Sequence, residues 1–248
     1  MKSVKVHVKS APSTAMILAA GLGTRLKPLT DTMPKALVPY NGVPMIQGLM
    51  LKLRNAGFTR IVINVHHFAD MLETFIRSHD GFGMDVSFSD ERDLLRDTGG
   101  GIRHAILSGL IGDEPVLVHN VDIITSGVDI MDFYTYSSPA ASLLVSERSS
   151  SRYLLADSYG LLRGWTYPSK GLVKGTGSAN VVAADFIPYA FSGIHVLTPE
   201  AMQLLPPWPE AFSIIDFYLS IADAHPVRCV CAPSGSIITD IGKITQFR

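Results

Sequence analysis

Cysteine is scarce in this sequence. Its 248 residues include two cysteines, Cys229 and Cys231, which lie two apart on one predicted strand. That spacing is geometrically poor for a disulfide, and without a second cysteine pair a structural zinc site is not expected. The two thiols therefore favour a reducing, cytoplasmic environment.

Charge is also low, and no long apolar run occurs. Charged residues make up 17% of the chain and the formal net charge is −1, so we expect neither a nucleic-acid partner nor a membrane surface. No segment approaches the roughly 18 consecutive apolar residues of a membrane-spanning helix. Residues 1–14 lack the apolar centre of a signal peptide, and we interpret them as a leader or an added strand.

Apolar residues are abundant, at 47% of the sequence, which is enough for the core of one domain over residues 15–248. Helical periodicity over 45–56 precedes a strand-like run at 60–65, and a second helical pattern follows at 69–77. This order predicts right-handed βαβ units in a Rossmann-like, mixed but mainly parallel sheet, flanked by helices in three α/β/α layers. Ligands bind such sheets at the carboxyl ends of the strands.

The clearest functional signal lies between Ala15 and Pro39, which reads AMILAAGLGTRLKPLTDTMPKALVP. A buried strand is followed by a glycine turn, where the backbone can approach an anion and point several N–H groups at it. Arg25 and Lys35 add positive charge suited to phosphate. Neither the Walker A pattern nor a complete GxGxxG is present, so those two nucleotide motifs are excluded.

Two aspartates, Asp122 and Asp240, each lie beside apolar, strand-like residues. A carboxylate in such a position is costly unless a cation holds it, and hard oxygen ligands suit Mg²⁺. A helix-capping role for Asp122 is the alternative. We interpret the pair as a two-carboxylate metal site.

Two glycine-containing segments have less specific patterns. Gly99, Gly100 and Gly101 precede a helical pattern at Ile102; alone they indicate a flexible loop, but beside the first loop they suggest close approach to a nucleotide base. Residues 167–185 are rich in Gly, Ser and Ala, which predicts a mobile loop. We expect this loop to reach over the part of the site that would bind a sugar.

Together these segments resemble the sugar-1-phosphate nucleotidyltransferases. The first is similar to the family signature LAAGxGTRLxPLTxxxPKxLxPxxGxPMI, and further matches occur at Ile61–Asn64, Asp97–Ile102, Asn120–Asp122, Phe191–Ile194 and Asp240–Gly242. Within the family, the chain looks most like the branch that uses UTP and N-acetylmuramate 1-phosphate in bacterial cell-wall sugar recycling. The resemblance implies a nucleotidyltransferase, GT-A-like fold and Mg²⁺-dependent transfer of a nucleoside monophosphate from an NTP to a sugar 1-phosphate, with release of pyrophosphate.

The resemblance also implies roles for individual positions. Arg25 and Lys35 would be catalytic, and Asp122 and Asp240 would bind Mg²⁺. The nucleotide would be bound by Ala20, Gly21, Gly23, Thr24, Glu91, Thr98 and Gly99, and the sugar phosphate by Asn120, Gly164 and Gly193.

The chain departs from the family pattern at several positions, which spare the charged groups but leave the acceptor pocket open. It has Asp97 where a glutamate is frequent, Val121 where glycine often precedes the metal aspartate, and Ile238 in place of a tryptophan. The Glu-Lys-Pro sugar-binding segment of the broader family is absent. The alternatives therefore stay open: a guanylyl- or cytidylyltransferase for a mannose or heptose 1-phosphate or phosphocholine, or a non-catalytic nucleotide-sugar sensor. We expect a monomer or homodimer.

Overall fold

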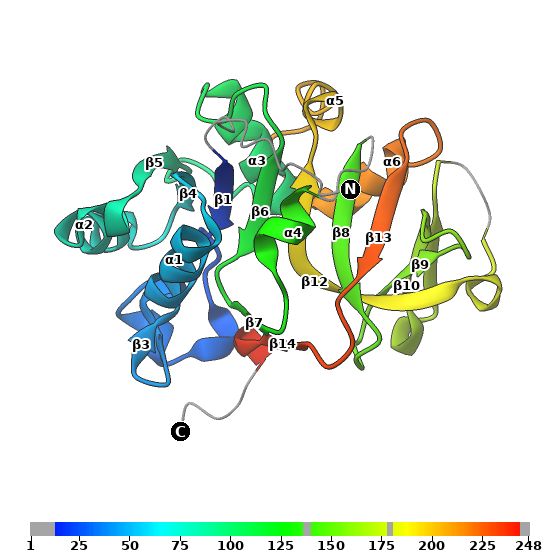
Figure 1. Ribbon diagram of the computed structural model, residues 1–248, viewed down its shortest axis with the longest axis horizontal. Coiled ribbons are helices and arrows are strands. Elements are labelled where there is room, and N and C mark those ends of the chain that lie inside the picture. The colour runs from blue at the N-terminus through cyan, green and yellow to red at the C-terminus, as the bar shows by residue number, and fades with distance from the viewer. Residues whose placement is uncertain (1–12, 136–139, 178–180, 244–248) are drawn as a thin grey trace, which may run out of the picture.

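The computed structural model describes residues 13–135, 140–177 and 181–243. The predicted leader thus lies outside the described residues, apart from Ser13 and Thr14, and Thr14 already begins the first strand. A ten-stranded sheet crosses the molecule in the order β11-β10-β9-β12-β6-β1-β4-β5, with β8 paired to β12 and β13 paired to β8 (Figure 1). Strands β9 and β10 lie at one end of the molecule, and β5 and α2 at the other.

The strands of this sheet are β1 (Thr14–Leu18), β4 (Arg60–Val65), β5 (Asp85–Asp90), β6 (Val116–Asn120), β8 (Ala141–Ser146), β9 (Tyr153–Ala156), β10 (Leu162–Tyr167), β11 (Leu172–Gly175), β12 (Ile187–Leu197) and β13 (Val227–Cys231). Two small antiparallel pairs are separate, β2 (Pro39–Tyr40) with β3 (Val43–Pro44) and β7 (Ile123–Ser126) with β14 (Ile237–Asp240). The helices are α1 (Met45–Ala56), α2 (Ala69–Ser78), α3 (Asp97–Leu107), α4 (Ile130–Thr135), α5 (Pro199–Met202) and α6 (Ile214–Ile221).

The central strands are parallel, as predicted. β1 runs parallel to both β4 and β6, and β5 runs parallel to β4. β12 is antiparallel to its neighbours β6, β8 and β9, and β9, β10 and β11 form an antiparallel extension of the sheet. The predicted mixed, Rossmann-like sheet is therefore confirmed.

Side chains along each strand alternate between the two faces of the sheet, and this alternation produces the predicted three α/β/α layers. Ala15 and Ile17 of β1 belong to a core with α1, α2 and α4, whereas Met16 belongs to a second core with α3, α5 and α6. Successive side chains of a strand point to opposite faces, so one apolar run can serve both cores. Helices consequently cover both faces of the sheet.

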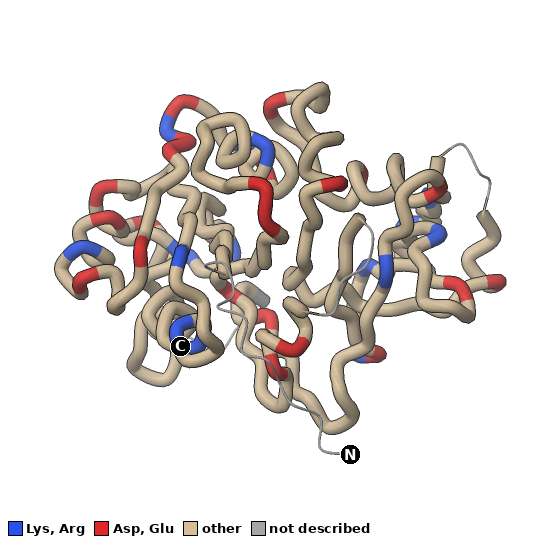
Figure 2. The backbone as a smooth tube through the Cα atoms, turned by 45° about the horizontal axis from the view of Figure 1, so that its top comes forward, with Lys and Arg blue, Asp and Glu red and all other residues tan. Residues whose placement is uncertain are grey.

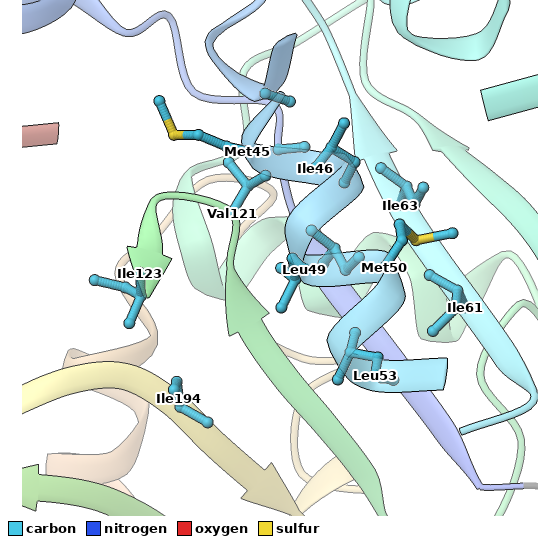
Figure 3. Close-up of a cluster of buried hydrophobic side chains, with 14 of the residues drawn as sticks. Met45, Ile46, Leu49, Met50, Leu53, Ile61, Ile63, Val121, Ile123 and Ile194 are labelled. Atoms are coloured by element: carbon cyan, nitrogen blue, oxygen red, sulfur yellow. The ribbon is translucent and has the colours of Figure 1, made fainter. Parts of the chain in front are cut away.

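Helix α1 has the predicted bounds, Met45–Ala56. Its apolar residues, among them Ile46 and Met50, lie against Ile61 and Ile63 of β4 (Figure 3). The helix ends because Gly57 adopts the left-handed conformation, with φ 103°, and donates its N–H to Leu53 and Arg54.

Helix α3 begins at Asp97, so the three consecutive glycines are helical and the predicted flexible loop is wrong. Close packing against another segment explains why residues without a side chain stand here. A β-carbon on Gly99 would lie 2.3 Å from the Phe212 ring, and one on Gly100 would lie 2.1 Å from the carbonyl oxygen of Glu210. The glycines therefore allow residues 210–212 to cross close above the helix.

One further expectation needs correction, and the structure adds two features that the sequence did not predict. Residues 167–185 were expected to be a loop, but those that the structure describes include β11; residues 178–180 of the loop lie outside the description. Strand β7 was not predicted. Cys229 is buried, but Cys231 is exposed, and both are free thiols. Among the described residues, no helix is long and apolar enough to cross a membrane.

Candidate active site

The centre of the site is an ion pair between Lys35 and Asp122. The Lys35 ammonium contacts Oδ2 of Asp122, and their side chains are only 14% and 9% exposed. Lys35 comes from the loop after β1, and Asp122 lies two residues after the end of the neighbouring strand β6. Both groups are thus held at the carboxyl edge of the parallel strands, where the sequence predicted a ligand site.

Asp240 reaches this centre through a strand pairing that the sequence did not reveal. β14 pairs with β7 so that Asp240 lies opposite Ile123, the residue next to Asp122. Beyond Asp240 the chain makes a tight turn, and a β-carbon on Gly242 would meet Oδ2 of Asp122 at 2.5 Å and Oδ1 of Asp240 at 3.2 Å. The two predicted metal ligands therefore converge on one point.

Gly23 shapes the glycine loop around Lys35. Its φ of 62° is in the left-handed region, and a β-carbon would lie 2.8 Å from Thr30 Cγ2 and 3.0 Å from Lys35 Cβ. Thr30 Oγ1 donates to the Gly23 carbonyl at 3.0 Å, which closes the loop. Only glycine fits this position without displacing Lys35.

A cavity of about 430 Å³, which we call the loop cavity, opens between this loop and α3. Among the predicted residues it is lined by Ala20, Gly21, Arg25, Lys35, Glu91, Thr98, Asn120, Asp122 and Asp240. No described atom lies within 4 Å of a β-carbon built on Gly21, so the loop has an open surface there. Such a wall of glycine backbone and cations is suited to a phosphate chain.

Asn64 and Glu91 form a buried polar pair at the back of the loop cavity. Asn64 Oδ1 accepts the backbone N–H groups of Ala19 and Ala20, at 2.6 and 3.2 Å, and its Nδ2 donates to Glu91 Oε1 at 2.9 Å. Burial raises the pKa of the Glu91 carboxyl, while the bond from Asn64 acts in the opposite direction. Asn64 thus orients Glu91 and ties the end of β1 to β4.

A second cavity, of about 800 Å³, lies over β9–β12, and we call it the sheet cavity. Trp165 and Tyr167 of β10 line it, together with Ser192 and Gly193 of β12. Gly193 has φ 80°, and a β-carbon there would lie 2.5 Å from Asn120 Nδ2. The glycine therefore lets Asn120 lie directly against β12.

The two cavities meet at a common wall. Arg25, Asn120, Ile123 and Asp240 line both of them. A group bound in one cavity can therefore reach a group bound in the other beside the Lys35–Asp122 pair. This arrangement suits the transfer of a group between two ligands.

Four predicted site residues, Gly23, Thr24, Gly99 and Gly164, do not line either cavity. Gly23 shapes the loop around Lys35, and Thr24 is exposed at the start of a 3₁₀ turn. Gly99 is buried with its N–H donated to the Phe212 carbonyl at 2.9 Å, and Gly164 is buried on the face of β10 opposite to Trp165 and Tyr167. The roles of these four residues stay predictions.

Five residues that line a cavity had no role predicted from the sequence: Asn64, Arg148, Trp165, Tyr167 and Lys174. Asn64 lies near the end of a buried strand and is the one member of the group with a local signal, a polar side chain after three apolar residues. The others carry no local pattern that separates them from ordinary surface residues.

The chain resembles known proteins over most of its length. Residues 14–160 match the nucleotidyl transferase family. The chain is 33% identical, over 92% of its length and 91% of the relative's, to N-acetylmuramate alpha-1-phosphate uridylyltransferase of Caulobacter vibrioides. A protein of the same name from Neisseria meningitidis is 40% identical over 52% of this chain and 53% of its own length. UDP-glucose pyrophosphorylase from Acinetobacter baumanii shares the fold, with a TM-score of 0.72 and 18% identity over 94% of this chain and 89% of that one.

The fold is of the GT-A-like type that solved nucleotidyltransferases share. The chain belongs to the nucleotidyl transferase family. Within that family it is a sugar-1-phosphate nucleotidyltransferase, as the resemblance of its N-terminal segment implied.

Proposed function

We propose that this enzyme transfers a uridylyl group from UTP to N-acetylmuramate 1-phosphate, giving UDP-N-acetylmuramate and pyrophosphate. The observation that carries the proposal is the common wall of Arg25, Asn120, Ile123 and Asp240 between the loop cavity and the sheet cavity. The choice of UTP and of this sugar is supported by the Caulobacter vibrioides relative, which matches along nearly the whole chain.

In the proposed reaction an oxygen of the acceptor phosphate attacks the α-phosphorus of UTP, and the bond to the leaving pyrophosphate breaks. The acceptor phosphate is already ionised at neutral pH, so no protein base is needed. Catalysis then consists of positioning and charge stabilisation. Arg25 and Lys35 supply the protein's cations at the meeting point of the cavities.

The loop cavity is the proposed UTP site. The backbone of Gly21 and Gly23, with Ala20 and Thr24 beside them, binds the triphosphate. Glu91 and Thr98 lie further along the cavity wall for the base and ribose, where the Glu91 carboxyl offers hydrogen-bonding oxygens held in place by Asn64. We assign Gly99 an indirect role, because its small size lets residues 210–212 support α3.

The sheet cavity is the proposed acceptor site. Asn120 and Gly193 stand at its junction with the loop cavity and bind the 1-phosphate, while the aromatic faces of Trp165 and Tyr167 suit a sugar ring. Gly164 keeps β10 close to β11: a β-carbon there would lie 2.7 Å from the carbonyl oxygen of Lys174.

Asp122 and Asp240 are the proposed ligands of Mg²⁺. Their convergence fits this ion, which is commonly held by one or two carboxylates with substrate phosphates and waters completing the shell. The described residues include no group of three or more metal-binding side chains, which agrees with a site that needs substrate oxygens. When bound, Mg²⁺ would neutralise charge on the phosphates. Lys35 holds Asp122 in place in the absence of substrate. When phosphates bind, they provide Lys35 with another anionic partner.

The test is pyrophosphate release with Mg²⁺, measured for each pairing of UTP, GTP, CTP, ATP and dTTP with a panel of sugar 1-phosphates. We expect the highest kcat/KM for UTP with N-acetylmuramate 1-phosphate. Preference for GTP with a mannose or heptose 1-phosphate, or for CTP with phosphocholine, would contradict the proposed substrates but not the reaction class. Nucleotide-sugar binding without turnover would instead indicate a sensor.

Two further expectations accompany this proposal. We propose that residues 15–248 form one nucleotidyltransferase domain, which the continuous ten-stranded sheet supports. A cytoplasmic location, expected from the cysteine content, stays a prediction.

A further inference from the structure

The sheet cavity has more cations than acids in its lining. Arg25, Arg148, Arg152, Lys170 and Lys174 line it, against two carboxylates, those of Asp216 and Asp240. Elsewhere on the described backbone, Lys and Arg are interspersed with Asp and Glu (Figure 2). The excess of positive charge in this cavity is therefore a local feature of the acceptor side.

Part of this charge is already accounted for. Lys174 pairs with Asp216 at 2.6 Å, and Arg25 lies at the wall shared with the loop cavity, beside Asp240. Arg148, Arg152 and Lys170 remain, and no carboxylate of a described residue lies within salt-bridge distance of any of the three. The proposed acceptor phosphate, at the wall with Arg25, does not explain why three more cations line the same cavity.

Arg148 differs from the other two in how it is held. It is half-buried, and its Nη2 donates to the carbonyl oxygen of Phe191 at 3.1 Å. Its Nε is buried and has no hydrogen-bond partner among the described residues. A guanidinium in such surroundings costs free energy unless an anion accompanies it.

The other two cations have an aromatic partner. Arg152 and Lys170 are exposed and lie over the ring of Tyr167, at 5.2 and 5.1 Å. Cation–π contacts of this kind stabilise a cation without a carboxylate. Arg148 is therefore the cation of the cavity with the strongest requirement for an anion.

We propose that Arg148 is the centre of a second anion subsite in the sheet cavity, separate from the 1-phosphate position, which binds a carboxylate of the acceptor. The inference rests on the proposed function and assigns a residue to the carboxylate that distinguishes the proposed acceptor from sugar 1-phosphates without one. Arginine suits this role because its planar fork can bind both oxygens of a carboxylate. N-acetylmuramate 1-phosphate has such a group on its lactyl ether, whereas N-acetylglucosamine 1-phosphate has the same ring without it.

The experiment compares these two acceptors in the full-length enzyme with UTP and Mg²⁺. For Arg148→Met, which removes the charge but keeps an apolar stem, we expect kcat/KM with N-acetylmuramate 1-phosphate to fall by about 10- to 150-fold, as for loss of a charged hydrogen bond. The value for N-acetylglucosamine 1-phosphate should change much less. The ratio of the two kcat/KM values should therefore fall by nearly the same factor. Arg148→Lys should restore part of the ratio.

Arg103→Met is the matched control. Arg103 also donates to a backbone carbonyl, that of Pro206, at 3.0 and 2.8 Å, but it lines neither cavity. The ratio between the acceptors should not change in this variant. A change of the same size would mean that the effect of Arg148→Met is structural.

Three results would overturn the proposal: an equal loss with both acceptors in Arg148→Met, a selective loss in Arg152→Met with Arg148→Met unaffected, or a wild-type enzyme indifferent to the carboxylate. Absence of turnover with either acceptor would instead refute the proposed function. In that case, equilibrium binding of glucuronate 1-phosphate and glucose 1-phosphate tests the subsite. Equal affinities for this pair would overturn it, and a preference for glucuronate 1-phosphate lost in Arg148→Met would support it.

Discussion

At the scale of single residues, Lys35 connects the glycine loop to the carboxylates. Its side chain is 14% exposed and that of Asp122 is 9% exposed, so each charge depends on the other in the absence of ligand. Removing one member of such a pair leaves an uncompensated charge, which is costly. A polyphosphate offers Lys35 a new anionic partner, and Asp122 is then available for a metal cation.

The first prediction concerns Lys35. Because a preorganised charge at a reacting phosphate commonly contributes about 3–4 kcal/mol, we expect Lys35→Ala to lower kcat by about two to three orders of magnitude. Lys27→Ala is the control, since Lys27 lies in the same loop but is 59% exposed and pairs with Asp31. Near-normal turnover of Lys35→Ala in the pyrophosphate assay would show that the proposed catalytic role is wrong.

The second prediction concerns Asp240. Asp240→Asn removes one negative charge from the point where the two carboxylates converge, so the Mg²⁺ concentration for half-maximal activity should rise at least about tenfold. Asp85→Asn, an exposed change at the far edge of the sheet, should leave the Mg²⁺ titration unaltered. An unchanged titration in Asp240→Asn would remove this residue from the metal site.

At the scale of elements, α3 shows how a packing requirement can resemble a ligand motif. Its glycines are buried against the segment that leads into α6, and the N–H groups of Gly99 and Gly100 both reach the Phe212 carbonyl. Thr98 strengthens this contact, because its hydroxyl accepts the N–H of Ile214 at 3.0 Å. The start of α3 and the start of α6 thus hold each other.

The third prediction compares one substitution in two helices. Gly100→Ala would place a methyl group 2.1 Å from the carbonyl oxygen of Glu210, and overpacking of this kind typically costs about 1–3 kcal/mol. Gly48 lies in α1 with no described atom within 4 Å of a β-carbon, so Gly48→Ala should stabilise the protein by up to about 1 kcal/mol. Thermal or denaturant unfolding measures both. Effects of the same sign would contradict the packing explanation for the α3 glycines.

At the scale of the whole molecule, two histidines lie in the buried sheet. Burial lowers the pKa of His119 to about 4 and that of His195 to about 3, so both are neutral in the folded protein at neutral pH. His195 contacts the Tyr218 hydroxyl at 2.5 Å, and His119 contacts the Asn120 carbonyl at 2.8 Å. The contact of His195 with Tyr218 links β12 to α6, whereas the contact of His119 lies within β6.

The fourth prediction follows from these lowered pKa values. The unfolded chain protonates its histidines near pH 6.5, while the folded protein resists protonation until the pH is much lower. Stability present above pH 6.5 is therefore lost as the pH falls toward the folded pKa values, by about 2 kcal/mol for each histidine between pH 7 and pH 5. The raised pKa of Glu91 acts in the opposite direction and reduces the net change.

Urea unfolding at the two pH values tests this prediction. In His195→Gln the loss of stability on acidification should be about half as large, even if the variant is less stable at both pH values. His67→Gln, which changes an exposed histidine, should keep the wild-type dependence. The same pH dependence in His195→Gln as in the wild type would contradict the assignment.

Much of the architecture follows from local patterns. The helix at Met45–Ala56 was predicted with its observed bounds because apolar period and a terminal glycine agree, and the strand at Arg60–Val65 was predicted because an unbroken apolar run suits a strand buried on both faces. Two elements were missed because local patterns do not include tertiary contacts. Strand β7 is short, and three consecutive glycines such as those of α3 are locally typical of a loop.

Local patterns in the sequence predict most of the strands and helices and the charged residues proposed for the site, and the resemblance of the N-terminal segment implies the reaction class. These depend on hydrophobic period and on a contiguous loop, which are local properties. The tertiary structure decided how Asp240 reaches its predicted partner Asp122, because the pairing of β14 with β7 connects segments far apart in the chain without any local signal. It likewise decided that Arg148 lines the acceptor cavity, since this position depends on a contact with Phe191 of another strand.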